Sequence, residues 1–91
     1  MAHSLSAKKR IRQNEKRRLA NKSKRTALKT RIRRVRDAIQ QQRVEDAVAA
    51  FREACKLLDR YAAQRLIHPN AAARKKSRLA RRLHALAQKA G

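Results

Sequence analysis

The chain has 91 residues and a formal net charge of +21, with 27 Lys or Arg against six Asp or Glu. A chain of this length holds one domain at most and buries only a thin core. Like charges at this density repel one another unless a polyanion lies among them, and nucleic acid is the commonest polyanion. The single Gly is the last residue. This excludes the glycine-rich phosphate loops of nucleotide-binding enzymes.

The charge divides the chain into three segments. Residues 1–36 carry 15 Lys or Arg and one acid, residues 37–66 carry five of each sign, and residues 67–91 carry seven Lys or Arg and no acid. An Arg-rich, acid-poor beginning is also typical of mitochondrial transit peptides, but this basic segment is longer than targeting needs and has no consistent apolar face. We therefore interpret the two basic segments as nucleic-acid-binding.

The first segment predicts one long helix over about residues 6–41, because nothing in it breaks a helix. Either Ser4 or Ser6 can cap its start. The second half of this helix has apolar residues at 4-3-4 spacing, which keeps one stripe facing a partner helix. These residues are Leu28, Ile32, Val35 and Ile39.

The first half of the same helix has no face that a protein core could cover. Ile11 and Leu19 stand nearly alone, and the cations point in every direction at about 100° per residue. A helix that is polar all round is not held by packing, so we infer a partner outside the chain that touches several sides. Thr26 and Thr30 are also available for sugar and phosphate oxygens. The predicted binding residues are Lys8, Lys9, Arg10, Arg12, Gln13, Asn14, Lys16, Arg17, Arg18, Asn21, Lys22, Ser23, Lys24, Arg25 and Lys29.

A second helix is predicted over about residues 44–66 and forms the core. Glu45 and Asp46 lie in its first turn, where the helix dipole favours negative charge. A single cysteine, Cys55, excludes an internal disulfide and fits a reducing compartment, and we interpret it as a small buried core residue. The shared apolar face consists of Val44, Ala47, Val48, Phe51, Ala54, Cys55, Leu58, Tyr61 and Ala62.

Pro69 interrupts this pattern, and Asn70 is predicted to cap a third helix over about residues 71–89. Its apolar face joins the bundle through Ala72, Leu79, Leu83, Leu86 and Ala90. Cations near the start of this helix are unfavourable, because the helix dipole is positive at that end. A phosphate bound by these cations and by free backbone N–H groups would remove this unfavourable interaction. The predicted binding residues here are Arg74, Lys75, Lys76, Ser77, Arg78, Arg81 and Arg82.

The sequence therefore predicts an all-α protein with one RNA-binding domain over residues 1–91. We expect a three-helix antiparallel bundle from which the long, basic N-terminal helix extends. Phe51 and Tyr61, the only large aromatic residues, lie in the neutral segment. Stacking on unpaired bases is therefore not expected, and contact with the backbone of a folded RNA is.

Other chemistry is not indicated. The three histidines His3, His68 and His84 lack metal-ligand spacing, and helical ion pairs explain the acids. We expect no enzyme activity, no metal or other cofactor and no small-molecule substrate. No stretch approaches the roughly 20 apolar residues of a membrane span, so no membrane association is expected.

Competing interpretations stay open at this point. A DNA-binding basic zipper would need the stripe that ends at Ile39 to continue as heptads, but it meets a second amphipathic segment and a Pro-Asn break. A nucleoid-compacting protein fits the charge alone. The basic run would otherwise be a solvated charged helix or a disordered tail.

Two strings resemble a known family: SAKKRIRQNEKRRLANKSKRTALKT (residues 6–30) and HPNAAARKKSRLARRLHAL (residues 68–86). They closely resemble the bacterial small-ribosomal-subunit proteins numbered twenty, and the match spans essentially the whole chain. The resemblance implies a cytoplasmic three-helix protein bound to 16S ribosomal RNA in the lower part of the small subunit, near other subunit components, and placed early in assembly. No homo-oligomer is expected.

The resemblance also implies how the chain meets RNA. The long first helix penetrates between RNA helices, and the polar residues of both strings that are predicted above match the RNA-facing runs of the family. The family has a Gly-containing turn between helices one and two and another before the His-x-Asn segment. This chain has Gln41-Gln42-Arg43 and Arg65 at those places.

Overall fold

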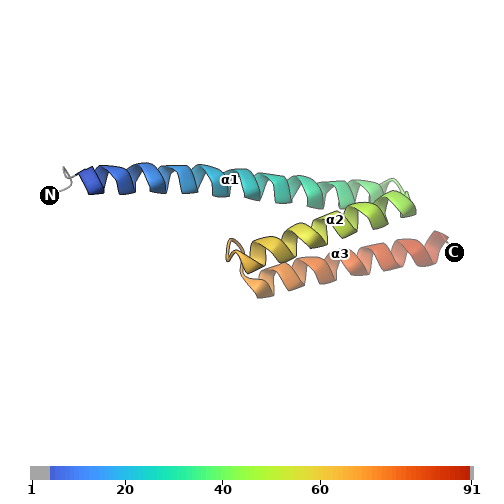
Figure 1. The fold of residues 1–91 in the computed structure, drawn as a ribbon. Helices are drawn as coiled ribbons and strands as arrows, with labels where there is room; N and C mark the ends of the chain where they lie inside the picture. The colour runs from blue at the N-terminus through green and yellow to red at the C-terminus, as the bar shows by residue number, and fades with distance from the viewer. Residues whose placement is uncertain (1–4, 91) are drawn as a thin grey trace.

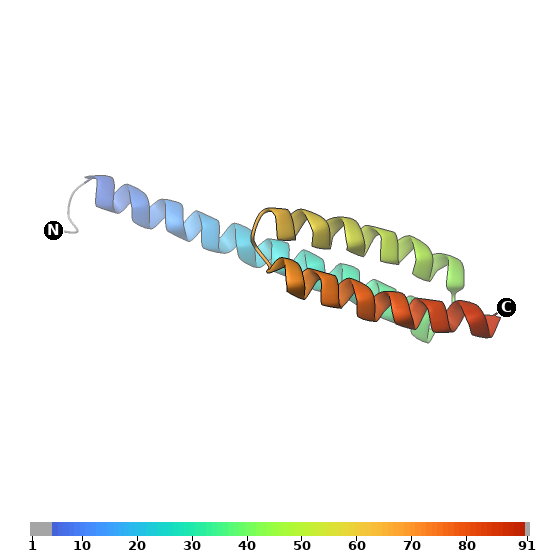
Figure 2. The ribbon, with the colours of Figure 1, turned by 90° about the horizontal axis from the view of Figure 1, so that it is seen from below.

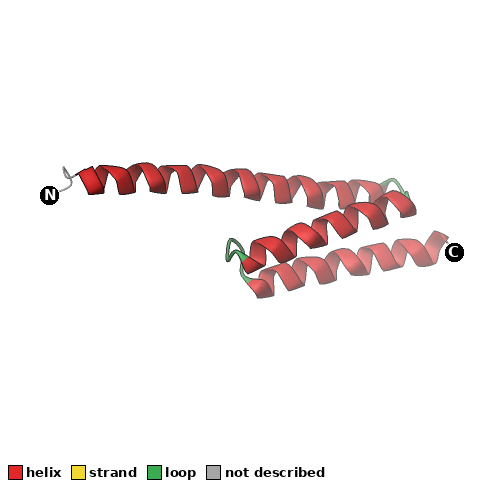
Figure 3. Cartoon of the chain, viewed as in Figure 1, coloured by secondary structure: helices red, strands yellow, loops and turns green. Residues whose placement is uncertain are grey.

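The computed structural model describes residues 5–90, which form three helices. They are α1 (Leu5–Gln40), α2 (Val44–Ala63) and α3 (Pro69–Ala90). Each helix runs antiparallel to the one before it, and α2 packs on both of the others (Figure 1). Two short turns join them, and no strand occurs in residues 5–90 (Figure 3). The predicted fold class, an all-α bundle with a long first helix, is confirmed.

The molecule is elongated because α1 is much longer than its partners. Its extents are 66 × 22 × 14 Å and its radius of gyration is 18.1 Å. A compact chain of this length has a radius of gyration of about 12 Å. With 36 residues α1 is roughly 54 Å long, whereas α2 has 20 residues. Figure 2 shows that the first half of α1 projects beyond the bundle formed by its second half, α2 and α3.

The core lies where the second half of α1 meets α2 and α3. Val35 and Leu58 are completely buried, and the predicted stripe of α1 is confirmed at Leu28, Ile32 and Val35. Ile39 is only half-buried, since α1 ends one residue later. Large side chains are few, so close packing of small ones completes the core. The buried residues are Leu28, Ile32, Val35, Ala38, Ala47, Ala54, Leu58, Tyr61, Ala72, Leu79 and Leu86.

α1 ends in a Schellman motif, although no glycine is present. The Gln42 N–H donates to the Ile39 carbonyl at 3.0 Å, and the Arg43 N–H donates to the Ala38 carbonyl at 3.0 Å. This pair of bonds needs a left-handed residue in between, which is usually Gly. Gln42 takes that conformation with φ of 58°.

α2 ends in the same way. The Arg65 N–H donates to the Ala62 carbonyl at 3.1 Å, the Leu66 N–H donates to the Tyr61 carbonyl at 2.9 Å, and Arg65 has φ of 59°. Both turns thus lie at the places where the resemblance implied a Gly-containing turn. The motif also stops α2 at Ala63, earlier than the predicted residue 66. The half-buried Leu66 then packs against the core.

The start of α3 differs from the prediction. α3 begins at Pro69, a residue suited to the first helical position because it has no N–H to satisfy. Asn70 is therefore not the cap. Its own N–H donates to His68 Nδ1 at 3.1 Å, and the Ala72 N–H donates to the His68 carbonyl at 3.0 Å. These two bonds make His68 the capping residue. Proline is favoured at the first helical position, so Pro69 determines where the helix begins and which residue caps it.

The start of α1 also differs slightly. α1 begins at Leu5, so Ser6 lies inside the first turn and is not the cap. Ser4 and His3, which were considered above, lie outside the described residues.

Candidate nucleic-acid interface

The N-terminal part of α1, residues 5–23, is here called the rod. It begins where the bundle ends: Lys24 is half-buried, and its Nζ donates to Oε1 of Gln64, beside the last turn of α2, at 3.0 Å. Every residue from 8 to 23 is exposed. Ile11 and Leu19 leave 61% and 55% of their surface uncovered. The prediction that this half of α1 has no protein core is confirmed.

The rod carries its charge on all sides. It holds eight Lys or Arg and one acid, Glu15. Glu15 pairs with Arg18 at 2.8 Å, and both side chains are exposed, so the pair contributes little to stability. All the predicted binding residues between Lys8 and Ser23 lie here and are exposed. The rod therefore presents a strongly positive surface with no preferred face.

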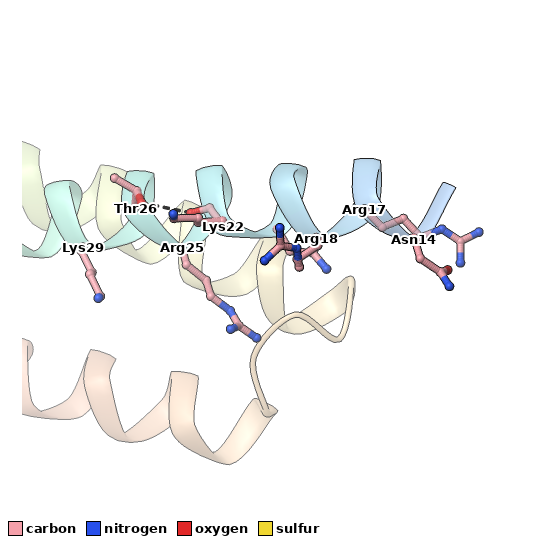
Figure 4. A pocket seen from close by; sticks show the side chains of 8 residues that line it. Asn14, Arg17, Arg18, Lys22, Arg25, Thr26 and Lys29 are labelled. Atoms are coloured by element: carbon pink, nitrogen blue, oxygen red, sulfur yellow. Dashed lines mark hydrogen bonds between the residues drawn. The ribbon is translucent and has the colours of Figure 1, made fainter. Parts of the chain in front are cut away.

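A hollow lies along α1 where the rod joins the bundle (Figure 4). It has a volume of about 570 Å³. Figure 4 shows Arg25 and Lys29 pointing from α1 toward the side on which α3 lies. All but one of the lining residues are among the predicted binding residues. The exception is Thr26, which was described only as available for sugar and phosphate oxygens. The lining residues are Asn14, Arg17, Arg18, Asn21, Lys22, Arg25, Thr26 and Lys29.

The hydroxyl groups of Thr26 and Thr30 already donate hydrogen bonds within α1. Thr26 Oγ1 donates to the Lys22 carbonyl and Thr30 Oγ1 donates to the Thr26 carbonyl, both at 3.0 Å. Each hydroxyl keeps lone pairs, which can accept from a ribose 2′-OH but not from a phosphate oxygen. The threonines are therefore suited to sugar contacts only.

The second basic cluster lies on α3, and its cations point in different directions. Arg74, Lys75, Ser77, Arg78, Arg81 and Arg82 are exposed. Lys76 is half-buried and donates to Oδ1 of Asp59 on α2 at 2.9 Å. This hydrogen bond raises the pKa of Lys76. Lys76 thus has a protein partner in the folded chain, while its predicted role in binding stays a prediction.

The predicted phosphate site at the start of α3 has few backbone donors. Pro69 has no N–H, and the N–H of Asn70 is taken by His68. The first cation, Arg74, follows more than one turn later. The start of α3 therefore offers the α3 cations little help in forming a phosphate site.

A groove between α1 and α3 has a volume of about 250 Å³. Arg36 lines this groove, although it was not predicted from the sequence to bind nucleic acid. Arg36 follows Arg18 by 18 residues, which is five full turns, so both side chains leave α1 in the same direction. The groove is lined by Ile32, Arg36, Lys75, Arg78, Leu79 and Arg82.

Other site chemistry is sparse in the described residues. Within residues 5–90, no group of three His, Cys, Asp or Glu side chains is placed to hold a metal ion. No helix in that range is long and apolar enough to span a bilayer. Cys55 is half-buried rather than buried. Burial raises the pKa of its thiol and the Asp59 carboxylate adds to this, while Lys76 acts in the opposite direction.

Comparison with known proteins places the chain in a family. A family model described as "Ribosomal protein S20" matches residues 2–84. Relatives named "Small ribosomal subunit protein bS20" include one from Rhodopirellula baltica, 54% identical over 79 residues, which are 87% of this chain and 88% of the relative. The relative from Thermobifida fusca is 49% identical over 88 residues, covering 97% and 96% of the two chains. One from Coxiella burnetii is 46% identical over 83 residues, covering 91% and 92%. The chain therefore belongs to the ribosomal protein S20 family.

Proposed function

We propose that this protein binds directly to folded 16S ribosomal RNA through its phosphate backbone and stabilises the packing of that RNA during assembly of the small subunit. Its family makes it a structural, non-enzymatic constituent of the small ribosomal subunit, in the bacterial cytoplasm. Direct contact with the RNA is the step that the geometry of the rod supports.

The observation that carries the proposal is the exposure of the rod. Its 19 residues extend roughly 28 Å past the bundle and present cations in every direction. A helix lying in the groove of a single duplex uses one face for binding. A rod lodged between RNA helices uses all of its faces, and it neutralises phosphates that would otherwise repel each other.

The apolar stripe of α1 argues against a basic zipper. Ile32 and Val35 are buried against α2 and α3 of the same chain. The stripe is therefore not available to a second copy of α1, as a zipper requires. Tyr61 is also buried, and Phe51 is half-buried in the core, so neither ring offers a platform for unpaired bases.

The proposal is tested by binding of the full chain to folded 16S ribosomal RNA and to duplex DNA at matched salt. We expect clear preference for the RNA and a steep fall of affinity with salt. A rod variant removes three exposed charges, and an α2 control removes the same number from α2. The rod variant is Arg12→Gln, Arg17→Gln and Lys22→Gln; the α2 control is Arg52→Gln, Lys56→Gln and Arg60→Gln.

The two variants are expected to differ in salt dependence. Each lost phosphate contact lowers the slope of log affinity against log salt by about 0.7 to 0.9, so the rod variant, which loses three, should lose about 2.1 to 2.7 units. The α2 control should keep the slope of the unmodified chain. Equal affinity for RNA and DNA, or equal slopes for the two variants, would contradict the proposal.

A further inference from the structure

We propose that the groove between α1 and α3 holds one sugar–phosphate strand of RNA, so that the protein lies on RNA with α2 turned away. The inference rests on the proposed function. It adds a second binding surface, on the folded bundle rather than on the rod. The occupant is a single phosphodiester strand.

The groove has an apolar floor and cationic walls. Ile32 and Leu79 form the floor and are 8% and 4% exposed. Four exposed cations surround them: Arg36 from α1, and Lys75, Arg78 and Arg82 from α3. No acid lines the groove. A cleft with one sign of charge and a floor of low dielectric constant concentrates the field, and this attracts a phosphate more strongly than a flat surface does.

These cations are not explained by the stability of the bundle. In the described residues, none of the four pairs with an acid, and they repel one another across the groove. Lys76 shows the contrast, because it lies next to Lys75 in sequence yet points to Asp59 of α2. Four of the six acids of the chain lie on α2, and none lines the groove between α1 and α3. A phosphate strand removes this repulsion.

The groove continues a row of cations that starts on the rod. Arg18, Arg25, Lys29 and Arg36 follow at intervals of seven, four and seven residues, so they lie within about 20° of one line along α1. The row is roughly 27 Å long. Its first three members line the hollow of Figure 4, and its last lines the groove. A strand that follows the hollow is therefore led between α1 and α3.

The charge of the three helices sets the orientation of the molecule. α2 carries four acids and three cations, whereas α3 carries seven cations and no acid. α2 packs on both α1 and α3, while those two contact each other less (Figures 1 and 2). The groove between α1 and α3 consequently opens on the side away from α2. RNA bound in it leaves the outer surface of α2 free.

The test compares two double variants of the full chain in binding to folded 16S ribosomal RNA. The groove variant is Arg36→Gln with Arg82→Gln, and the matched control on α2 is Arg52→Gln with Arg60→Gln. We expect the groove variant to bind at least about tenfold more weakly than the control and to lose about 1.4 to 1.8 units of salt slope. Because it relieves repulsion, it should melt at the same temperature as the unmodified free protein or higher. Equal binding by the two variants would overturn the proposal.

A second measurement maps the position of the bound RNA directly. After Cys55→Ala, a single cysteine is introduced by Arg78→Cys at the groove or by Arg52→Cys on α2, and an RNA-cleaving iron chelate is attached to it. Cleavage of bound RNA from position 78 and not from position 52 supports the proposal. Equal cleavage from both positions, or cleavage from position 52 alone, overturns it.

The two proposals fail in different ways. If the unmodified chain has no preference for 16S ribosomal RNA, the proposed function fails. If the unmodified chain binds and the rod variant is impaired while the groove variant matches its control, only the groove proposal fails.

Discussion

Replacing Gln42 by Gly is expected to stabilise the free protein, although it deletes a side chain. Gln42 has φ of 58° and joins the two hydrogen bonds that end α1. The left-handed conformation costs an L-residue about 1 to 2 kcal/mol, and Gly avoids that cost. Gly also increases the conformational entropy of the unfolded chain, which lowers the stability of the folded protein by about 0.5 to 1 kcal/mol. The net effect of Gln42→Gly is about 0.5 to 1 kcal/mol of added stability.

Arg65, with φ of 59°, offers the same test at the other end of α2. The two turns share no partners, so Gln42→Gly and Arg65→Gly should add. At about 4 to 8 °C per kcal/mol for a domain of this size, each should raise the melting temperature by about 2 to 8 °C. Thermal unfolding followed by circular dichroism at the helical band measures this. Arg65→Gln controls for the lost charge.

The matched control is Gln41→Gly, one position earlier. The Gln41 N–H donates to the Asp37 carbonyl at 2.9 Å as a helical residue does. Gly there should lower stability by up to about 1 kcal/mol. If Gln42→Gly lowers the melting temperature as Gln41→Gly does, Gln42 is not left-handed in solution, and the account of this turn is wrong.

Three further predictions concern the bundle. Leu58→Ala empties a completely buried position and should cost about 2 to 5 kcal/mol in urea unfolding, whereas a loss below about 1 kcal/mol would show that the core is looser than described. Asp59→Asn should cost about 0.5 kcal/mol near neutral pH, because the pair with Lys76 is partly exposed. Pairing raises the pKa of Lys76, so this stabilisation is present at neutral pH and is lost as the pH rises through that raised pKa. The unmodified protein and Asp59→Asn should therefore have the same stability in alkaline buffer. A difference in stability that persists there would refute the assignment of this pair. Burial raises the pKa of Cys55, so its reaction with a disulfide reagent should need a higher pH than that of an unstructured cysteine, and identical pH profiles would contradict this.

Periodicity predicted the helices and most of the core, because burial on a helix follows spacing. The stripe at Leu28, Ile32 and Val35 is buried as its spacing requires. The turns were harder to place, because Gln42 and Arg65 take a conformation that sequence patterns associate with Gly. The cap of α3 was misplaced since Asn70 is the better capping residue in general, whereas Pro69 fixes the helix start here.

The rod was predictable and the groove was not, for a physical reason. Charge that surrounds a helix is visible from the order of its residues alone. The groove brings together Arg36 and Lys75, which are far apart in sequence. It forms only after the turns on either side of α2 have brought α3 back alongside α1. Neighbouring residues also separate: Lys75 lines the groove, while Lys76 donates to Asp59. A basic cluster in a sequence therefore does not show which of its members face RNA.

The central claim is that residues 8–23 of α1, which are exposed on the folded chain, are fixed by RNA. Amide hydrogen exchange of the full chain, alone and bound to folded 16S ribosomal RNA, tests it most directly. An isolated helix of this length is marginally stable in water, so residues 8–23 should exchange rapidly in the free protein, while the buried part of α2 is protected. Binding should slow the exchange of residues 8–23 strongly. Protection of the rod equal to that of α2 without RNA, and unchanged when RNA is added, would contradict the account.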